Sequence, residues 1–592
     1  MTDLRKDLPT KDTWDLTHLF KDSESFNKEK DALKKEISVF PEKHPETKDE
    51  ILAYLRRSDE LEQRLEKLYC YANMLHDTDG ADALATGMLQ QAESLYVAYS
   101  AQTAFFVPEL LLRPEEFLKE LTKDERFFDY EYQLKSLLKR KQHVLSPEEE
   151  KLLAEAGDIF SQFDTVFSQL DNVDLPFPKI KDGEGNTVTL SHARYGAFLS
   201  SPDRALRRRT FLAYYKAYKQ NIHTITAVYA GSVKKDAFVT KARKYESCLS
   251  RALATEDVSP AVYENLLSAV GKGLPALHEY MRVRKKELNY KQMHMYDLHV
   301  PLVKNAELKL SYEEAFALVK ESLSLLGKEY CETLQRAKDE RWIDVYETKG
   351  KRSGAYSCGV YGVHPYVLLN YTPTTRDVFT IAHELGHAMH SFRSDSALPY
   401  SKAGYRIFVA EVASTVNELL LLKHLLKKET DVSLRRYLLS YFLDTVRTTM
   451  FRQTMFAEFE AFSHSLAEQG APLTKEAFSE EYLNLNKKYY GPAVVHDNDI
   501  MYEWCRIPHF YTAFYVYKYA TGIISAISIV ERLTTKGEDA VKDYLRFLSS
   551  GGSDSPVELL KIAGVDLTTE KPFNDAIAAF SDALKEFEST KA

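Results

Sequence analysis

Cysteine is scarce in this chain, with 5 residues among 592. The cysteines are scattered and odd in number, at positions 70, 248, 331, 358 and 505. This pattern excludes the paired framework of a small disulfide-stapled protein, and it contains no CxxC zinc motif. We therefore expect core or bystander thiols in a protein of the reducing cytoplasm.

Glycine and proline are also few, 23 and 20 residues, which excludes a long disordered or flexible linker. We expect no membrane span, because no stretch looks apolar enough, and no signal peptide, because residues 1–7 have no apolar core. The net charge of -9 argues against a general nucleic-acid binder. The basic cluster from Arg204 to Arg209 has a helical pattern, which is typical of a solvated helix face. We expect neither a membrane nor a nucleic acid as partner, and the sequence makes no prediction of oligomeric state.

What the chain does have is the composition of a globular protein, with 44% hydrophobic and 28% charged residues. Its length leaves room for two or more domains. Residues 25–170 show the period of successive amphipathic helices, and residues 173–190 show extended segments around a turn at 182–186, which predicts a β-hairpin. We expect a mainly α fold, with an N-terminal helical domain over residues 1–190 and a second domain over residues 191–592.

The stretch from Trp342 to Tyr371 is rich in β-forming residues and predicts a small β-sheet. An extended peptide can add itself to a free strand edge, so such a sheet can hold a substrate. A hairpin that only packs on the following helix explains the pattern equally well.

A metal-binding motif stands at His383 to His387, where the sequence reads HELGH. Residues four apart lie one turn apart on the same face of a helix, so both histidines can reach one ion. Glu384 follows the first histidine and is placed to accept a proton from a water that zinc activates. The spacing predicts His383 and His387 as ligands of a hydrolytic zinc ion and Glu384 as its general base.

The residues around this motif predict a buried helix. Pro373 stops any earlier helix, and Thr374 with Asp377 has the pattern of a capping box. Gly386 lowers helix stability by roughly 1 kcal/mol relative to alanine, which suggests that something approaches its backbone closely. His390 lies roughly 60° around the helix from the second histidine of the motif, and we expect it either to support the metal ligands or to be structural. The alternative for the motif is a pair of hydrogen-bonded core histidines.

A hydrolytic zinc ion needs a third protein ligand and keeps one position open for water. The apolar helix predicted over residues 408–420 carries two carboxylates, Glu411 and Glu418. They share a face and lie roughly 10 Å apart along the axis, so one ion cannot use both. The spacing alone favours neither glutamate.

The sequence resembles the oligoendopeptidase F family, which belongs to the thimet-oligopeptidase-like zinc peptidases. The paired motifs at residues 383–390 and 408–414 carry the resemblance most specifically. Further similar stretches extend it over nearly the whole chain: residues 14–17, 351–356, 367–371 and 506–511. The resemblance implies one Zn²⁺ ion per chain with Glu411 as its third ligand. It also implies a zincin-like catalytic domain, capped by the N-terminal helical domain, in a clam-like body around a deep cleft.

The oxyanion that develops during peptide hydrolysis needs hydrogen-bond donors besides the zinc ion. Residues 502–519 supply candidates among many aromatic side chains. Our order of preference is His509, then Tyr515 and Tyr517, with Tyr511 fourth. Because aromatic stripes on helices are usually core, we expect at least half of these residues to serve packing.

Together these patterns predict a zinc-dependent endopeptidase, and the family resemblance implies short oligopeptides as its substrates. A zinc aminopeptidase is one alternative, although no motif marks an acidic group for the free amine of a substrate. A non-enzymatic helical scaffold with a degenerate metal motif is another. End-blocked peptides test the first alternative, and metal analysis with a chelator-reversible assay tests the second.

Overall fold

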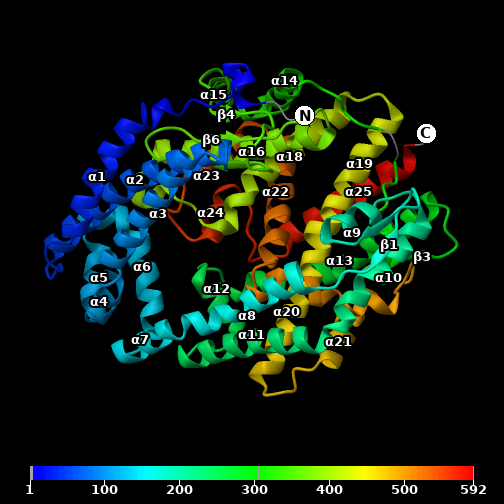
Figure 1. Cartoon of the computed structure of the whole chain (residues 1–592), viewed down its shortest axis with the longest axis horizontal. Helices are drawn as coiled ribbons and strands as arrows, with labels where there is room; N and C mark the ends of the chain where they lie inside the picture. The colour runs from blue at the N-terminus through cyan, green and yellow to red at the C-terminus, as the bar shows by residue number, and fades with distance from the viewer. Residues whose placement is uncertain (1–3, 304–305, 591–592) are drawn as a thin grey trace. The chain divides into compact units, whose positions relative to one another are not determined.

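The computed structural model describes residues 4–303 and 306–590, and these residues are mainly helical (Figure 1). The strands in these ranges are only two or three residues long. The prediction of a mainly helical chain with a small β-sheet is confirmed. The zincin-like details and the clam-like body stay predictions.

Two compact units divide the chain, and each consists of three separate stretches. The first unit comprises Met1–Gln142, Glu307–Lys427 and Ile529–Val565. The second unit comprises His143–Ala306, Lys428–Ser528 and Asp566–Ala592. The sequence predicts consecutive domains that meet near residue 190, and that boundary stays a prediction.

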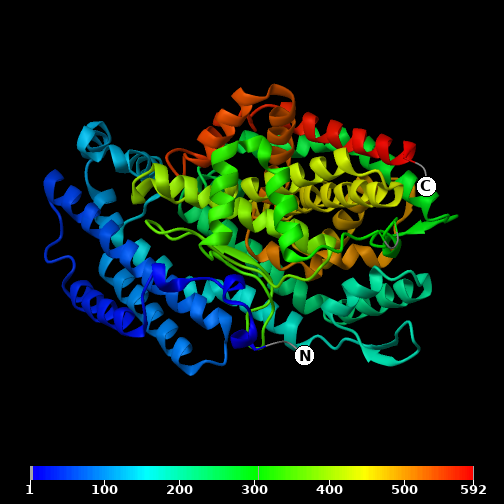
Figure 2. The same cartoon turned by 90° about the horizontal axis from the view of Figure 1, so that it is seen from above.

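The helices predicted between residues 25 and 170 are present. In the first unit they are α1 (Ser23–Val39), α2 (Lys48–Thr78), α3 (Ala83–Thr103), α4 (Phe106–Leu112), α5 (Glu115–Lys123) and α6 (Glu131–Arg140). Capping boxes at Asp22 and Thr47 begin α1 and α2, because each side chain accepts a backbone N–H that would otherwise be unpaired. The first three helices lie side by side in both views (Figures 1 and 2) and bury a shared core that includes Phe26, Leu33, Leu61, Leu65 and Leu68.

One helical stretch within the described ranges, Ala83–Leu112, is long and apolar enough to cross a membrane, with a mean hydropathy of 1.2. This corrects the expectation that no stretch approaches that threshold. Length and composition alone are weak evidence for a span, because core helices of soluble proteins meet the same criterion. One face of this stretch packs against α2, with Ala85, Met88 and Ala92 buried.

The second unit contains the predicted hairpin. Strand β1 (Lys179–Lys181) pairs with β2 (Thr187–Thr189) in antiparallel register. The remaining helices of this unit are α7 (Pro147–Glu155), α8 (Gly157–Gln169), α9 (His192–Leu199), α10 (Arg204–Gln220), α11 (Ile222–Ala242), α12 (Cys248–Thr255), α13 (Pro260–Glu287), α19 (Val432–Val446), α20 (Arg452–Glu468), α21 (Lys475–Tyr490) and α25 (Lys571–Ser589). Strands β3 (Met293–His294) and β7 (Val494–Val495) form a parallel pair.

The basic cluster at the start of α10 was expected to be a solvated helix face, and this is only partly right. Arg207 is buried, and its guanidinium donates to Asp297 over 2.9 Å. Arg204 donates to the same carboxylate over 2.8 Å. A buried charge needs such a partner, so part of the cluster is structural.

The first unit also contains the sheet and the helix that carry the predicted site. Strands β4 (Ile343–Asp344), β6 (Tyr366–Leu368) and β5 (Tyr356–Cys358) form a sheet in the order β4-β6-β5, with β4 parallel and β5 antiparallel to β6. Both β5 and β6 pack against α16 (Thr375–Ala397). Other helices of this unit are α14 (Tyr312–Ser322), α15 (Lys328–Asp339), α17 (Tyr400–Ala403), α18 (Ile407–Lys428), α23 (Glu538–Leu548) and α24 (Pro556–Ile562), and α22 (Tyr517–Lys536) contributes residues to both units.

Candidate metal centre

The predicted motif helix is α16, and it begins where the sequence indicates. The Thr374 side chain accepts a hydrogen bond from the backbone N–H of Asp377. The Asp377 carboxylate does not complete the predicted capping box, because it accepts from the backbone N–H of Thr372 instead. The apolar residues around the motif are buried, as predicted: Val378, Phe379, Ile381, Ala382, Leu385, Ala388 and Met389.

His383, His387 and Glu411 come together in one cluster, with their ligand atoms all within 4.8 Å of one another. The two histidine Nε2 atoms are 3.2 Å apart. Glu411 Oε2, which comes from α18, lies 3.4 Å from His383 Nε2 and 3.6 Å from His387 Nε2. Among residues 4–303 and 306–590, this is the one group of three potential ligands at such distances.

The spacing of these atoms fits a tetrahedral zinc ion. Zinc binds histidine nitrogen and carboxylate oxygen at about 2.1 Å, which places the ligand atoms of a regular tetrahedron about 3.4 Å apart. The observed separations, from 3.2 to 3.6 Å, bracket that value. Two imidazoles and one carboxylate are also a donor set of hydrolytic zinc sites. The ligand roles of these residues stay a prediction, and this geometry supports it.

Glu418 lies at the outer nitrogen of the His383 ring. His383 Nδ1 donates to Glu418 Oε1 over 2.6 Å, which leaves Nε2 turned toward Glu411 and His387. A carboxylate in this position fixes the orientation of a metal-binding histidine. Burial lowers the pKa of His383, but the hydrogen bond to Glu418 and the nearby carboxylate charges outweigh burial and raise the pKa to about 9.

Glu384 is buried next to the cluster, with 7% of its surface exposed. Burial raises its pKa above the ordinary value of a glutamate, which makes the carboxylate a better proton acceptor near neutral pH. His390 is not part of the cluster. It is buried, and its ring stacks on Tyr405 with the ring centroids 3.7 Å apart, as expected for a structural residue.

Gly386 lets α16 and α18 approach each other closely, as its mid-helix position predicts. A Cβ atom added there would lie 2.5 Å from Ser414 Cα and 2.7 Å from Ala413 O. Asn417 joins the same two helices, because its Nδ2 donates to Ala382 O over 3.1 Å. No role was predicted for Asn417, although a polar residue inside an apolar helix signals a buried hydrogen bond.

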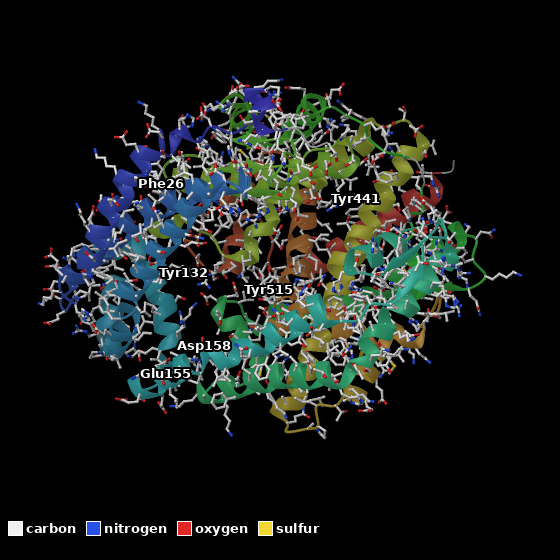
Figure 3. The ribbon with its side chains drawn as sticks, viewed as in Figure 1. Phe26, Tyr132, Glu155, Asp158, Tyr441 and Tyr515 are labelled. Atoms are coloured by element: carbon white, nitrogen blue, oxygen red, sulfur yellow. The ribbon has the colours of Figure 1, made fainter. Side chains whose placement is uncertain are left out.

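The predicted oxyanion donors His509, Tyr515 and Tyr517 belong to the second unit. His509 is exposed, and its Nε2 lies 3.4 Å from the hydroxyl of Tyr519. Its ring stacks on that of Tyr515, labelled in Figure 3, with the centroids 5.9 Å apart. Although the residue as a whole is exposed, partial desolvation of the ring lowers the pKa of His509, which favours the neutral ring at neutral pH. The catalytic role of these residues stays a prediction.

Several aromatic residues of this segment are core residues, as the sequence indicates. Tyr511 and Tyr517 are 7% and 1% exposed. The Tyr517 ring packs on Tyr263 with the centroids 5.4 Å apart. His509 and Tyr515 are therefore more accessible than Tyr517 to a substrate.

A strained turn shapes the segment between His509 and Tyr517. Phe514 has a φ of 56°, a conformation that residues with a side chain rarely adopt. Its backbone N–H donates to Glu460 Oε1 over 2.9 Å, and Glu460 is fully buried on α20. Burial raises the pKa of Glu460 well above its ordinary value. No sequence pattern links these two residues, which lie 54 positions apart.

Comparisons with known proteins cover the whole chain. Residues 197–579 match the family described as peptidase family M3, and residues 109–177 match the one described as oligopeptidase F. The oligopeptidase PepF of Bacillus subtilis is 41% identical over 99% of this chain and 88% of its own length. A crystal structure from Chlamydophila abortus is 36% identical, with a TM-score of 0.95 over 100% of both chains. The oligoendopeptidase-F of Enterococcus faecium is 33% identical, with a TM-score of 0.72 over 96% of this chain and 99% of that one.

Proposed function

This chain belongs to peptidase family M3, and we infer from that membership that it is a zinc-dependent oligopeptidase. The observation in the structure that carries the inference is the spacing of His383, His387 and Glu411, whose ligand atoms lie 3.2 to 3.6 Å apart. We propose that these three side chains bind one zinc ion per chain. The single cluster of this kind in the described part of the chain supports that stoichiometry.

When bound, the zinc ion supplies a Lewis acid that makes a water molecule nucleophilic near neutral pH. Glu384 accepts the proton of the attacking water at its carboxylate and delivers it to the nitrogen of the leaving amine. Burial of Glu384 favours its protonated form, so the carboxyl group can hold the proton between the two steps. Glu418 keeps the His383 ring oriented throughout.

The proposed substrates are short, unstructured peptides that are cut at internal bonds. The names of the relatives from Bacillus subtilis and Enterococcus faecium, an oligopeptidase and an oligoendopeptidase, support this substrate class. A short peptide with both ends blocked should therefore be cleaved, and a stable folded protein should survive. A strict need for a free amino terminus would favour the aminopeptidase alternative instead.

The experiment that tests the mechanism replaces Glu384 with glutamine. Glu384→Gln keeps the size of the side chain but removes its basic oxygen, so turnover should fall at least about a hundredfold. The zinc content, measured by elemental analysis, should stay that of the wild type. A matched control is Glu332→Gln, because the Glu332 side chain on α15 is 62% exposed and forms an ion pair with Lys328 on the same helix. Near-normal turnover of a zinc-loaded Glu384→Gln protein would sink the proposed role.

A further inference from the structure

Two of the five cysteines meet inside the first unit. Cys70 lies on α2 and Cys358 ends β5, and their Sγ atoms are 3.4 Å apart although 288 positions separate them in the sequence. Cys70 is 6% exposed, whereas Cys358 is partly exposed. The two thiols share an apolar cluster with Trp14, Met74 and Tyr366. The spacing of the cysteines along the chain does not predict this proximity.

Contacts that do not involve sulfur hold the backbone around the two thiols. The N–H of Arg352 donates to the carbonyl of Asp77 over 2.8 Å, and the Tyr356 hydroxyl donates to the Asp77 carboxylate over 2.9 Å. These bonds join the end of α2 to the segment that contains β5. A disulfide bond is about 2.05 Å long, so the two Sγ atoms need to approach by only about 1.4 Å.

A cavity of about 460 Å³ lies beside the two thiols, although neither cysteine lines it. Gly359, which directly follows Cys358, lines the cavity, and so does Glu66, which lies one helical turn before Cys70. The wall is rich in carboxylates, which attract neutral or cationic molecules more than anionic ones: Asp59, Glu62, Glu66 and Asp395. A small cationic disulfide such as cystamine is therefore a suitable reagent.

We propose that Cys70 and Cys358 are a modification site at which low-molecular-weight disulfides form a reversible intrachain cross-link. The Cys358 thiolate attacks one sulfur of the reagent and expels one small thiolate, which leaves a mixed disulfide on Cys358. Cys70 then loses its proton, attacks Cys358 Sγ and expels the second small thiolate. The two cysteines lose two electrons and two protons, and the reagent is reduced to two thiols.

The order of the two attacks follows from the surroundings of each sulfur. The hydrogen bond to Cys358 and burial raise the pKa of Cys70 well above its ordinary value, so Cys70 is a poor first nucleophile. Cys358 is the more exposed thiol of the pair. It forms the mixed disulfide, and its Sγ atom then stays within reach of Cys70.

The cross-link would tie together two stretches of the first unit that are distant in sequence. Strand β5 packs against α16, the helix that carries the candidate metal ligands, and a Cβ atom added at Gly359, the residue after β5, would lie 2.9 Å from Ser391 Cβ on that helix. Cys70, in turn, belongs to the N-terminal helices. Closing so long a loop restricts the unfolded chain, so oxidation should raise the midpoint of thermal unfolding by about 5 °C. The zinc ligands contain no sulfur and should not change.

The experiment treats the full-length, zinc-loaded protein with cystamine and measures intact mass and peptide maps without reduction. The wild-type protein should lose two hydrogen atoms and yield one peptide pair joined through Cys70 and Cys358. A phosphine reductant should restore both thiols. Cys358→Ser and Cys70→Ala should each abolish the joined peptide. Serine is suitable at position 358 because this partly exposed position can accommodate a hydroxyl group. The matched control is Cys331→Ser, which removes a partly buried thiol that donates to Lys320 O in α14 and should cross-link like the wild type.

Two results would overturn the proposal. One is a wild-type protein that keeps both thiols, or that stops at mixed disulfides, under conditions in which cystamine oxidises a model dithiol. The other is a treated wild-type protein whose joined peptides do not contain Cys70 and Cys358. Folding of each variant is checked by its unfolding midpoint before treatment, and Cys70→Ala serves if Cys358→Ser is unstable.

Discussion

Replacing Gly386 with alanine tests how closely the two ligand-bearing helices must approach. The added Cβ atom would lie 2.5 Å from Ser414 Cα, 2.7 Å from Ala413 O and 2.8 Å from Ser414 N. All three are backbone atoms of α18, so no flexible side chain can move aside. Ordinary contacts begin near 3.4 Å, and the helices must therefore separate by about 0.9 Å at this point.

The expected change in the stability of Gly386→Ala is the balance of two opposing effects. Overpacking of this kind lowers stability by about 1–3 kcal/mol, and backbone contacts favour the upper part of that range. Alanine in place of glycine stabilises a helix by roughly 1 kcal/mol, so the net loss should be about 1–2 kcal/mol. Glu411 lies one turn before Ser414 on α18 and moves with it. Zinc ligands tolerate displacements of about 0.2 Å, so zinc affinity should fall at least about tenfold.

Urea unfolding and a zinc titration against a competing chelator measure the two effects. Gly87→Ala is the matched control, because Gly87 lies in α3 of the same unit and a Cβ atom there would meet nothing within 4 Å. That variant should gain up to about 1 kcal/mol and keep its zinc affinity. A Gly386→Ala protein that matches the wild type in both stability and zinc affinity would refute this prediction.

Three further predictions concern the site and its surroundings. Glu411→Ala should reduce zinc content far more than Glu418→Ala, because Glu411 is the one of the two that approaches both histidine Nε2 atoms. Elemental analysis measures the zinc content, and the reverse ranking would contradict the ligand assignment. Burial raises the pKa of Glu66 to about 7, so the wild type loses stability as pH rises from the unfolded value of 4.5 through 7. Glu66→Gln should therefore be about 1–2 kcal/mol more stable than the wild type at pH 8 and equal to it at pH 4. Urea unfolding at both pH values measures this, and the same difference in unfolding free energy at pH 4 and pH 8 would refute it. His509→Ala and Tyr515→Phe should each lower turnover about 10²–10³-fold with zinc retained, and unchanged turnover in both would place the oxyanion donors elsewhere.

Features that depend on neighbours along the chain could be predicted from the sequence. Thr374 caps α16 because a threonine side chain can reach an N–H three residues ahead. The buried face of α16 follows from its apolar period. The close approach at Gly386 follows from the stability that a glycine sacrifices in mid-helix. Each of these needs only local geometry.

Features that depend on distant partners could not be predicted in this way. Cys70 and Cys358 approach only because β5 packs near the end of α2. Glu460 stabilises the turn at Phe514 through one hydrogen bond across 54 positions. The interleaving of three stretches in each compact unit is likewise a property of tertiary packing. Hydrophobic periodicity carries no information about which distant elements meet.

The two glutamates of α18 show which part of the site could be predicted from the sequence and which part depends on tertiary packing. Helical spacing places Glu411 and Glu418 on one face, two turns apart, and this alone cannot separate a ligand from a supporting residue. The crossing of α18 over α16 separates them, because it directs Glu411 to Nε2 of His383 and Glu418 to Nδ1 of the same ring. One imidazole can thus hold a metal with one nitrogen while a carboxylate fixes the other. If His383 binds zinc as we propose, Glu418 is explained as the partner that its outer nitrogen needs, and Glu411 as the ligand.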